Sequence, residues 1–240
     1  MTRLRQLTLT GVLLCVVMSV PVAATYSSYL PLEIGDRWAY SSDLVGPDIK
    51  EVVSGPNPVF GNSFMIRYLV SDHSPGLENH WTSNDEGDVY LHGFRRRNPR
   101  LAFFYDPPLK VVDAPLYPGK TWISAVDLAT TPGGPSIGRY VVRYTVTQPE
   151  SHIVEGVEIV AFGVMETTES EGVAGVGTEW LTDGRPSDSG KADPVVPHWW
   201  APGVGEIQYR SIGIFHLVGF SLPRVANEAS TWSDLKKLYR

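Results

Sequence analysis

Short runs of β-branched and aromatic residues recur along most of this chain, and clusters of turn residues separate them. Clear examples are residues 37–41, 49–54, 64–70, 121–129, 139–147 and 214–220. Each run has the length of a β-strand, and turn residues such as Gly35-Asp36 and Gly55-Pro56 lie beside them. Short strands at hairpin spacing predict an all-β, mainly antiparallel fold.

One hairpin is indicated with particular clarity. Residues 79–83 and 88–92 are β-rich, and Asn84-Asp85-Glu86-Gly87 lies between them. Glycine takes a positive φ without a steric penalty, so we expect Gly87 to hold that conformation in the turn. Farther along, the apolar run 101–105 is expected to end at Pro107-Pro108, because proline cannot donate a ladder hydrogen bond.

The composition supports this fold class and leaves its architecture open. The chain has 23 Gly, 19 Pro, seven Trp and eleven Tyr. Many turns and many large aromatic side chains are typical of a curved antiparallel sheet, a half-barrel or a sandwich. Only the C-terminal end has helical features, since Thr231 can cap a helix on which Trp232, Leu235 and Leu238 share one face. We therefore expect a short C-terminal helix.

The first 24 residues have the pattern of a secretory signal peptide. Arg3 and Arg5 precede an apolar run over residues 7–20, and small or compact residues follow up to Ala24. We expect cleavage after Ala24 and one β-rich domain over residues 25–240. The apolar run is shorter than the roughly 20 residues of a transmembrane helix. The predicted location of the mature protein is periplasmic or extracellular.

Cysteine and charge exclude some classes of protein. The one cysteine, Cys15, lies inside the predicted signal peptide, so the mature chain is expected to be cysteine-free and stabilised by packing alone. The formal net charge is −6, and it becomes more negative when Arg3 and Arg5 are removed. This charge gives no reason to expect nucleic acid as a partner. No later apolar run is long enough for a transmembrane span in the mature chain.

The sequence contains no recognisable metal or cofactor motif. The six histidines form neither His-x-His nor His-Glu-x-x-His, so we expect no metal site and no cofactor. His80 and His92 face each other on the predicted hairpin, where cross-strand surface positions explain them better than a metal site. Asp85, Glu86 and Asp88 fit the needs of the turn better than a calcium site.

No catalytic residues are predicted either. Gly-x-Ser-x-Gly and Ser-x-x-Lys are both absent. The glycine-rich segment 172–177 lacks the lysine of a phosphate-binding loop. Carboxylates or a triad assembled from distant residues could still make a hydrolase, and that alternative stays open.

Two short segments are candidate ligand-binding residues. Arg95, Arg96 and Arg97 form a basic run that could hold an anionic group, and the simpler alternative is a solvated loop. Trp199 and Trp200 could stack on a ligand, and the alternative is that they pack in the core.

Three segments resemble a pattern of uncharacterised secreted or periplasmic bacterial β proteins. Residues 29–40 resemble their opening Y-x-P-L-x-x-G-x-x-W-x-Y, residues 117–122 are similar to a central element of the form G-x-x-W, and residues 199–207 are similar to a W-Y-A-P-G-V-G element. The resemblance implies an all-β envelope protein, and it implies no catalytic residues. Gly35 and Gly119 each precede a tryptophan by three residues, and a tight turn followed by that tryptophan is expected to anchor a strand to the core. Gly203 and Gly205 are expected to permit a bend or bulge after Trp200.

These observations favour an exported, non-enzymatic β protein. Its partner would be an apolar small molecule, a lipid or an envelope protein, because cavities in curved sheets are typically apolar. A secreted hydrolase is one alternative. A structural or assembly module that docks through an edge strand or an aromatic patch is another.

Overall fold

The structure is a computed structural model, and it describes residues 28–42, 44–70, 76–96, 101–168, 197–210 and 214–222. Twelve strands make up almost all of the regular structure in these ranges. They are β1 (Arg37–Ser42), β2 (Asp48–Asn57), β3 (Ser63–Val70), β4 (Glu78–Ser83), β5 (Val89–Arg96), β6 (Leu101–Val112), β7 (Thr121–Ala129), β8 (Gly138–Val154), β9 (Val157–Thr168), β10 (His198–Ala201), β11 (Gly205–Arg210) and β12 (Ile214–Ser221). One 3₁₀ turn, η1 (Pro58–Phe60), connects β2 to β3.

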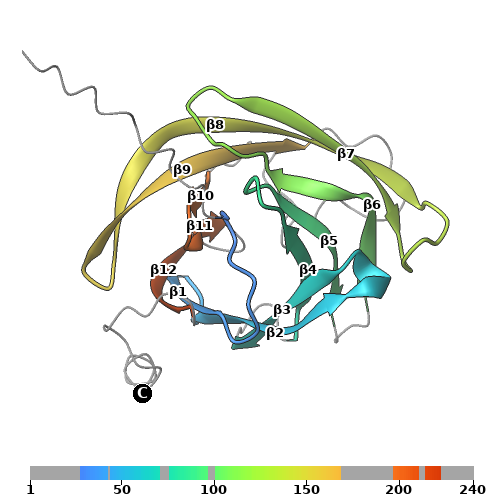
Figure 1. Ribbon diagram of the computed structural model, residues 1–240, viewed down its shortest axis with the longest axis horizontal. Coiled ribbons are helices and arrows are strands. Elements are labelled where there is room, and N and C mark those ends of the chain that lie inside the picture. The colour runs from blue at the N-terminus through green and yellow to red at the C-terminus, as the bar shows by residue number, and fades with distance from the viewer. Residues whose placement is uncertain are drawn as a thin grey trace, which may run out of the picture.

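The strands form one closed antiparallel barrel (Figure 1). Each strand pairs with its neighbours in sequence, and β1 closes the ring by pairing with β12 in a register that sets Trp38 opposite Phe220. The prediction of an all-β, antiparallel fold is therefore confirmed. The sequence left a half-barrel and a sandwich open as architectures. Because β1 pairs with β12, the sheet is instead one continuous closed barrel.

The segment before β1 crosses one end of the barrel (Figure 1). The backbone N–H of Gly203, in the β10–β11 turn, donates to the carbonyl of Ser28 at 2.9 Å. On the opposite side, the N–H of Leu116 donates to the hydroxyl of Tyr29 at 3.4 Å. Tyr29 and Leu30 are both buried. This segment therefore closes the barrel end at which β1 begins and β12 ends.

The glycines expected in turns lie in turns and have positive φ values. Gly35 and Gly119 have φ values of 99° and 81°, and Gly87 in the β4–β5 turn has 96°. The tryptophans that follow the first two glycines anchor their strands. Trp38 is almost fully buried, and Trp122 stacks on Tyr144 at a ring distance of 5.0 Å.

Strand β6 departs from its prediction. The sequence placed its end at Pro107-Pro108, but the strand continues to Val112. Its register against β5 shifts between the pair Gly93–Phe104 and the pair Leu91–Leu109. The two prolines lie inside this irregularity, where the missing N–H groups remove no ladder hydrogen bond.

The longest hairpin, formed by β8 and β9, extends beyond its neighbours (Figure 1). Strand β8 has 17 residues, whereas β10 has four and pairs with β9 only from His198 to Trp200. The register of β8 against β9 shifts between Val146 and Pro149, where the hairpin leaves the barrel wall. Ile153, Val157 and Val160 are exposed near its tip.

Several predictions concern residues outside the described ranges. These are the signal peptide over residues 1–24, the glycine-rich segment 172–177 and the C-terminal helix. Within the described ranges there is no α-helix, and so none long and apolar enough to cross a membrane.

Candidate functional site

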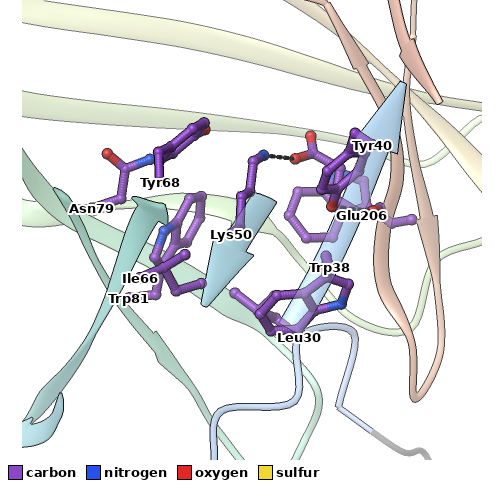
Figure 2. A pocket seen from close by; sticks show the side chains of 10 residues that line it. Leu30, Trp38, Tyr40, Lys50, Ile66, Tyr68, Asn79, Trp81 and Glu206 are labelled. Carbon is purple, nitrogen blue, oxygen red and sulfur yellow. Dashed lines mark hydrogen bonds and ion pairs between the residues drawn. The ribbon is translucent and has the colours of Figure 1, made fainter. Parts of the chain in front are cut away.

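A small pocket lies inside the barrel, between the wall made by β1–β4 and the wall made by β10 and β11. Figure 2 shows its lining: Leu30, Trp38, Tyr40, Lys50, Ile66, Tyr68, Asn79, Trp81, Trp200 and Glu206. The volume open to the centre of a water molecule is about 20 Å³. A cavity needs about 10–15 Å³ of such volume to hold one water. The pocket thus admits a group the size of one water molecule.

Three indoles form much of the pocket wall. Trp81 on β4 and Trp200 on β10 meet across the interior, with ring centroids 6.5 Å apart. Trp38 is fixed by its Nε1, which donates to the carbonyl of Val204 at 2.7 Å. A Cβ atom on Gly205 would lie 3.1 Å from that Nε1, so glycine allows the close approach. The wall is apolar and held in one geometry.

Two polar atoms of the lining are buried and lack a hydrogen-bond partner among the described residues. One is the donor Nε1 of Trp200, and the other is the acceptor Oδ1 of Asn79. The Trp200 side chain is almost completely buried, with 2% of its residue surface exposed. An unpaired buried polar group costs about 1–3 kcal/mol. Both atoms have almost no accessible surface, so they lie within the packed wall and do not open on the free volume of the pocket.

Lys50 on β2 extends into the pocket, where three tyrosine rings surround its ammonium group; Figure 2 shows two of them, Tyr40 and Tyr68. Its Nζ lies 3.6 Å from the ring centroid of Tyr209, 4.7 Å from that of Tyr40 and 5.0 Å from that of Tyr68. The faces of aromatic rings attract a cation, most strongly where water is excluded. This cage stabilises an ammonium group that is otherwise costly to bury.

Glu206 on β11 connects Lys50 to a histidine. Its Oε2 lies 3.4 Å from Lys50 Nζ, and its Oε1 lies 2.6 Å from Nδ1 of His198. Burial raises the pKa of Glu206, but the nearby charge of Lys50 and the hydrogen bond of His198 outweigh burial and lower it. For His198, burial lowers the pKa, and the hydrogen bond and charge of Glu206 outweigh burial and raise it. Both pKa shifts favour an ion pair between a deprotonated Glu206 and a protonated His198.

Glu166 on β9 behaves in the opposite way. Burial raises its pKa and outweighs the charge of His198 and the hydrogen bond of Tyr140. The Tyr140 hydroxyl lies 3.2 Å from Oε1 of Glu166 and donates to it. Two carboxyl groups on either side of His198 therefore have pKa values shifted in opposite directions, with Glu206 lower and Glu166 higher.

A third carboxyl group, that of Asp48, is also bonded by a tyrosine hydroxyl. Tyr209 donates to its Oδ2, and Tyr40 donates to the backbone carbonyl of Glu206 at 2.7 Å. Burial is the largest cause of the raised pKa of both tyrosines, so both hydroxyls stay protonated donors. Lys50, Glu206 and His198 are thus paired with one another, whereas Asp48 and Glu166 each accept a hydrogen bond from a tyrosine hydroxyl.

The structure separates the two predicted tryptophans. Trp200 lines the pocket, whereas Trp199 faces the other side of the wall and packs against His152 at a ring distance of 4.9 Å. Arg95 and Arg96 lie at the end of β5 and do not line the pocket, and Arg97 lies outside the described residues. Of the five predicted residues, Trp200 alone is found at the pocket.

His80 is not the surface residue that the sequence predicted. It is 1% exposed and stacks on Phe60 of η1 at 4.3 Å. Burial, with Arg95 adding to its effect, lowers its pKa to about 4. A register shift in β4–β5 places His80 opposite Gly93, and His92 instead bonds the Thr82 hydroxyl at 2.9 Å. The expected surface pair fails because η1 covers this face.

The acidic hairpin turn needs no ion to explain it. Asp85 and Glu86 are exposed, and Asp88 accepts hydrogen bonds from Lys110 Nζ at 2.9 Å and from the Ala114 N–H at 2.7 Å. Within the described part of the chain, no three His, Cys, Asp or Glu side chains are grouped as metal ligands would be.

Sequence reasoning did not find Lys50, Glu206 and His198. A β-bulge explains why the sequence did not predict an interior position for Glu206. The register of β10 against β11 shifts between Trp199, which pairs with Gln208, and Trp200, which pairs with Glu206. The extra residue brings Glu206 and Tyr209 to the same interior face, although they are three positions apart. Simple alternation would put them on opposite faces.

Comparison of the chain with protein-family models, with curated proteins and with solved structures found no match. The geometry of the pocket must therefore carry the functional interpretation. That geometry combines a rigid aromatic wall with a paired set of charged side chains. Such a pocket can bind a small ligand and fix its orientation.

Proposed function

We propose that this protein is exported and that it works as a non-enzymatic binding protein with a small ligand in the barrel pocket. The observation that carries the proposal is the composition of the barrel pocket, in which an aromatic wall of Trp38, Trp81 and Trp200 meets the polar side chains of Lys50, Asn79 and Glu206. Ligand sites typically combine an apolar wall with a few directed polar groups.

The proposed ligand is smaller and more polar than a lipid tail. Lys50, Glu206 and Asn79 share the lining with the indoles, and the free volume is about 20 Å³. A long apolar ligand would leave these polar groups facing hydrocarbon. A compact amphipathic ligand avoids that penalty.

Native mass spectrometry tests the binding function. The mature protein, purified gently from its own envelope fraction, is expected to carry a small-molecule adduct that is lost on denaturation. The Trp200→Phe variant should lose the adduct, and the Trp199→Phe variant should keep it, because Trp199 faces away from the pocket. A clean apoprotein mass for both the native protein and the Trp199→Phe variant would contradict the proposal.

Export rests on the N-terminal sequence pattern and has its own test. Fractionation of the source cells should place the protein outside the cytoplasm, and N-terminal sequencing should begin at Thr25. A protein that stays in the cytoplasm with residues 1–24 attached would contradict export. The pocket would be unaffected by that result.

A hydrolase is the second candidate, and the opposite pKa shifts of Glu166 and Glu206 favour it. Two carboxyl groups whose pKa values are shifted in opposite directions can act as base and acid. Glu206 lines the pocket, but His198 and Lys50 already pair with both of its oxygens. Turnover of glycoside or ester substrates that disappears in the Glu206→Gln variant would favour this candidate over simple binding.

A further inference from the structure

We infer that the outer part of the β8–β9 hairpin, residues 148–161, is a strap that lies on the outer wall of the barrel and is released when His152 gains a proton. The strap lies outside the barrel, so its release does not depend on what the pocket binds. Its pairing, the side chains beneath it and the charges around His152 all support this behaviour.

The strap has no further partner in the sheet among the described residues. Strand β7 pairs with β8 over residues 138–145, and β10 pairs with β9 over residues 162–164. Beyond these limits the two strands of the hairpin pair with each other. A two-stranded hairpin on its own is only marginally stable in water, so packing against the barrel must hold the strap in place.

A hinge separates the strap from the barrel wall. The register of β8 against β9 shifts between Val146 and Pro149, and such an irregularity bends a strand. Pro149 also lacks the N–H that would otherwise join the ladder. The strap can therefore change its angle to the wall without breaking the pairing on the barrel side of this point.

A row of side chains lies under the strap. Trp199, Gln208 and His216 are cross-strand partners on β10, β11 and β12, so they share the outer face of the wall. Trp199 and Gln208 are nevertheless buried. The ring of His152 packs on Trp199 at a centroid distance of 4.9 Å, and β8 also contacts β12 (Figure 1). The strap therefore crosses this row, with His152 at the contact.

The two faces of the strap differ in exposure. The register places His152, Val154 and Ala161 on one face, and both Val154 and Ala161 are buried there. Ile153 and Val160 lie on the other face and are exposed. Few side chains thus hold the strap against the wall, and one of them can be charged.

The surroundings of His152 disfavour its protonated form. Its Nε2 is buried and has no hydrogen-bond partner in the part of the chain that the structure describes. Burial lowers the pKa of His152, Glu150 on β8 raises it in part, and His216 on β12 lowers it further. The residues that face it from β9 and β10, Ile159 and Trp199, carry no charge.

The direction of the pH effect follows from these contacts. In the released strap the ring is in water, where a histidine has a pKa of about 6.5. The pKa is lower in the docked strap, so docking is complete above pH 6.5 and weakens as the pH falls below that value. His198 has the opposite sign, because its pKa is raised and its protonation stabilises the barrel. Release would uncover the outer side of β10, whose Trp200 lines the pocket.

Hydrogen exchange followed by mass spectrometry tests the release. Peptides from residues 150–160 are compared with peptides from β7 at pH 8 and pH 5, after correction for the intrinsic exchange rate. The protection of the strap should fall severalfold at pH 5, whereas that of β7 should not. The pKa of His80, about 4, lies below this range.

Three variants assign the effect to His152. His152→Gln keeps a polar side chain without a titrating ring, so the strap should be equally protected at both pH values. His216→Gln removes the second charge and should reduce the effect. His92→Gln is the matched control, because His92 is also half-buried in a hairpin and burial lowers its pKa. The strap in that variant should respond as in the native protein. If circular dichroism shows that His152→Gln does not fold, His152→Phe keeps a ring on Trp199.

Several results would overturn the release. An equal fall in protection in the native protein and in His152→Gln would remove the role of His152. Protection that rises at pH 5 would show that the protonated ring gains from the face of Trp199 and holds the strap. An equal fall in the strap and in β7 would indicate unfolding of the whole barrel. None of these results would bear on the binding function proposed for the pocket.

Discussion

His198 Nδ1 lies 2.6 Å from Oε1 of Glu206, which places a histidine–carboxylate pair on two adjacent strands of the barrel. The other oxygen of the same carboxylate lies 3.4 Å from Lys50 Nζ, across the interior on β2. One carboxylate therefore connects β10 and β11 to β2, which lies three strands from β11 around the ring. These strands are far apart in the sequence, so the contact stabilises the closed barrel as well as the pocket.

Replacing Glu206 by Gln is expected to destabilise the protein strongly. The variant would leave Lys50 and His198 without their shared carboxylate, and breaking a buried ion pair from one side costs roughly 3 kcal/mol or more. Urea denaturation at pH 6 measures the free energy of unfolding.

The control is Glu51→Gln, which breaks the outer pair with Arg37 (Nη2–Oε2 distance 2.7 Å). That pair is more open to water, so its loss should cost under about 1 kcal/mol. Equal losses in the two variants would contradict a special role for Glu206.

The His198–Glu206 pair should make stability depend on pH in a defined window. The pKa of His198 is raised above 6.5, so its contribution is complete below that value and is lost as the pH rises through the folded pKa. The pKa of Glu206 is lowered below 4.5, so its contribution is complete above that value and is lost as the pH falls through the folded pKa. The pair therefore stabilises most between about pH 4.5 and 6.5.

Melting temperatures of the native protein and the His198→Gln variant test this window. Their difference should be largest near pH 5.5 and should shrink as the pH rises toward 9. The other titrating groups, including His80 with its pKa lowered to about 4, are present in both proteins and largely cancel. A difference that stays constant over this range would show that His198 acts by packing alone.

Much of the fold could be predicted from the sequence because its signals are local. The β4–β5 hairpin followed from one turn glycine, and the positions of Trp38 and Trp122 followed from Gly35 and Gly119. Closure of the barrel was not predictable in this way. It depends on the pairing of β1 with β12, at opposite ends of the described ranges, and no local pattern marks that pair.

The residues of the pocket could not be predicted from the sequence for a different reason. In β2 the residues Asp48, Lys50 and Val52 share the buried face, while Ile49 lies on the other side. Hydrophobicity alone would turn Ile49 inward and Lys50 outward. The arrangement is stable because partners from β1, β3 and β11 surround Lys50, and a sequence does not show which distant residues will meet.

Strands β5 and β6 approach each other so closely at Gly93 that a Cβ atom should not be tolerated there. Such an atom would collide with the carbonyl oxygen of Phe103 and would lie 3.0 Å from Cα of Phe104, and φ is +152°. We expect Gly93→Ala to lose at least about 3 kcal/mol of unfolding free energy, since backbone must move. Gly119→Ala is the matched control. Its φ is +81°, and nothing lies within 4 Å of the added carbon, so the cost should be about 1 kcal/mol. A mild effect at Gly93 would show that the two strands can separate.

Leu30 connects the segment at the barrel end to the pocket, and its truncation should affect both. The side chain is 5% exposed and forms part of the pocket lining. Leu30→Ala is therefore expected to lower the free energy of unfolding by about 2–4 kcal/mol, through lost burial and the cavity left behind. Leu44→Ala is the control, because Leu44 is 75% exposed and its truncation should change stability by less than about 0.5 kcal/mol.

The same variant tests whether the segment over residues 28–36 forms the floor of the pocket. With Leu30 shortened, the pocket loses part of its wall beside Trp38, so the small-molecule adduct expected in native mass spectrometry should be weakened, while Leu44→Ala should keep it. Proteolysis near the N-terminus should also become faster in Leu30→Ala, because the hydrogen bonds of Ser28 and Tyr29 lose the packing beside them. If Leu30→Ala matched Leu44→Ala in stability, binding and proteolysis, the segment would lie on the barrel without closing it.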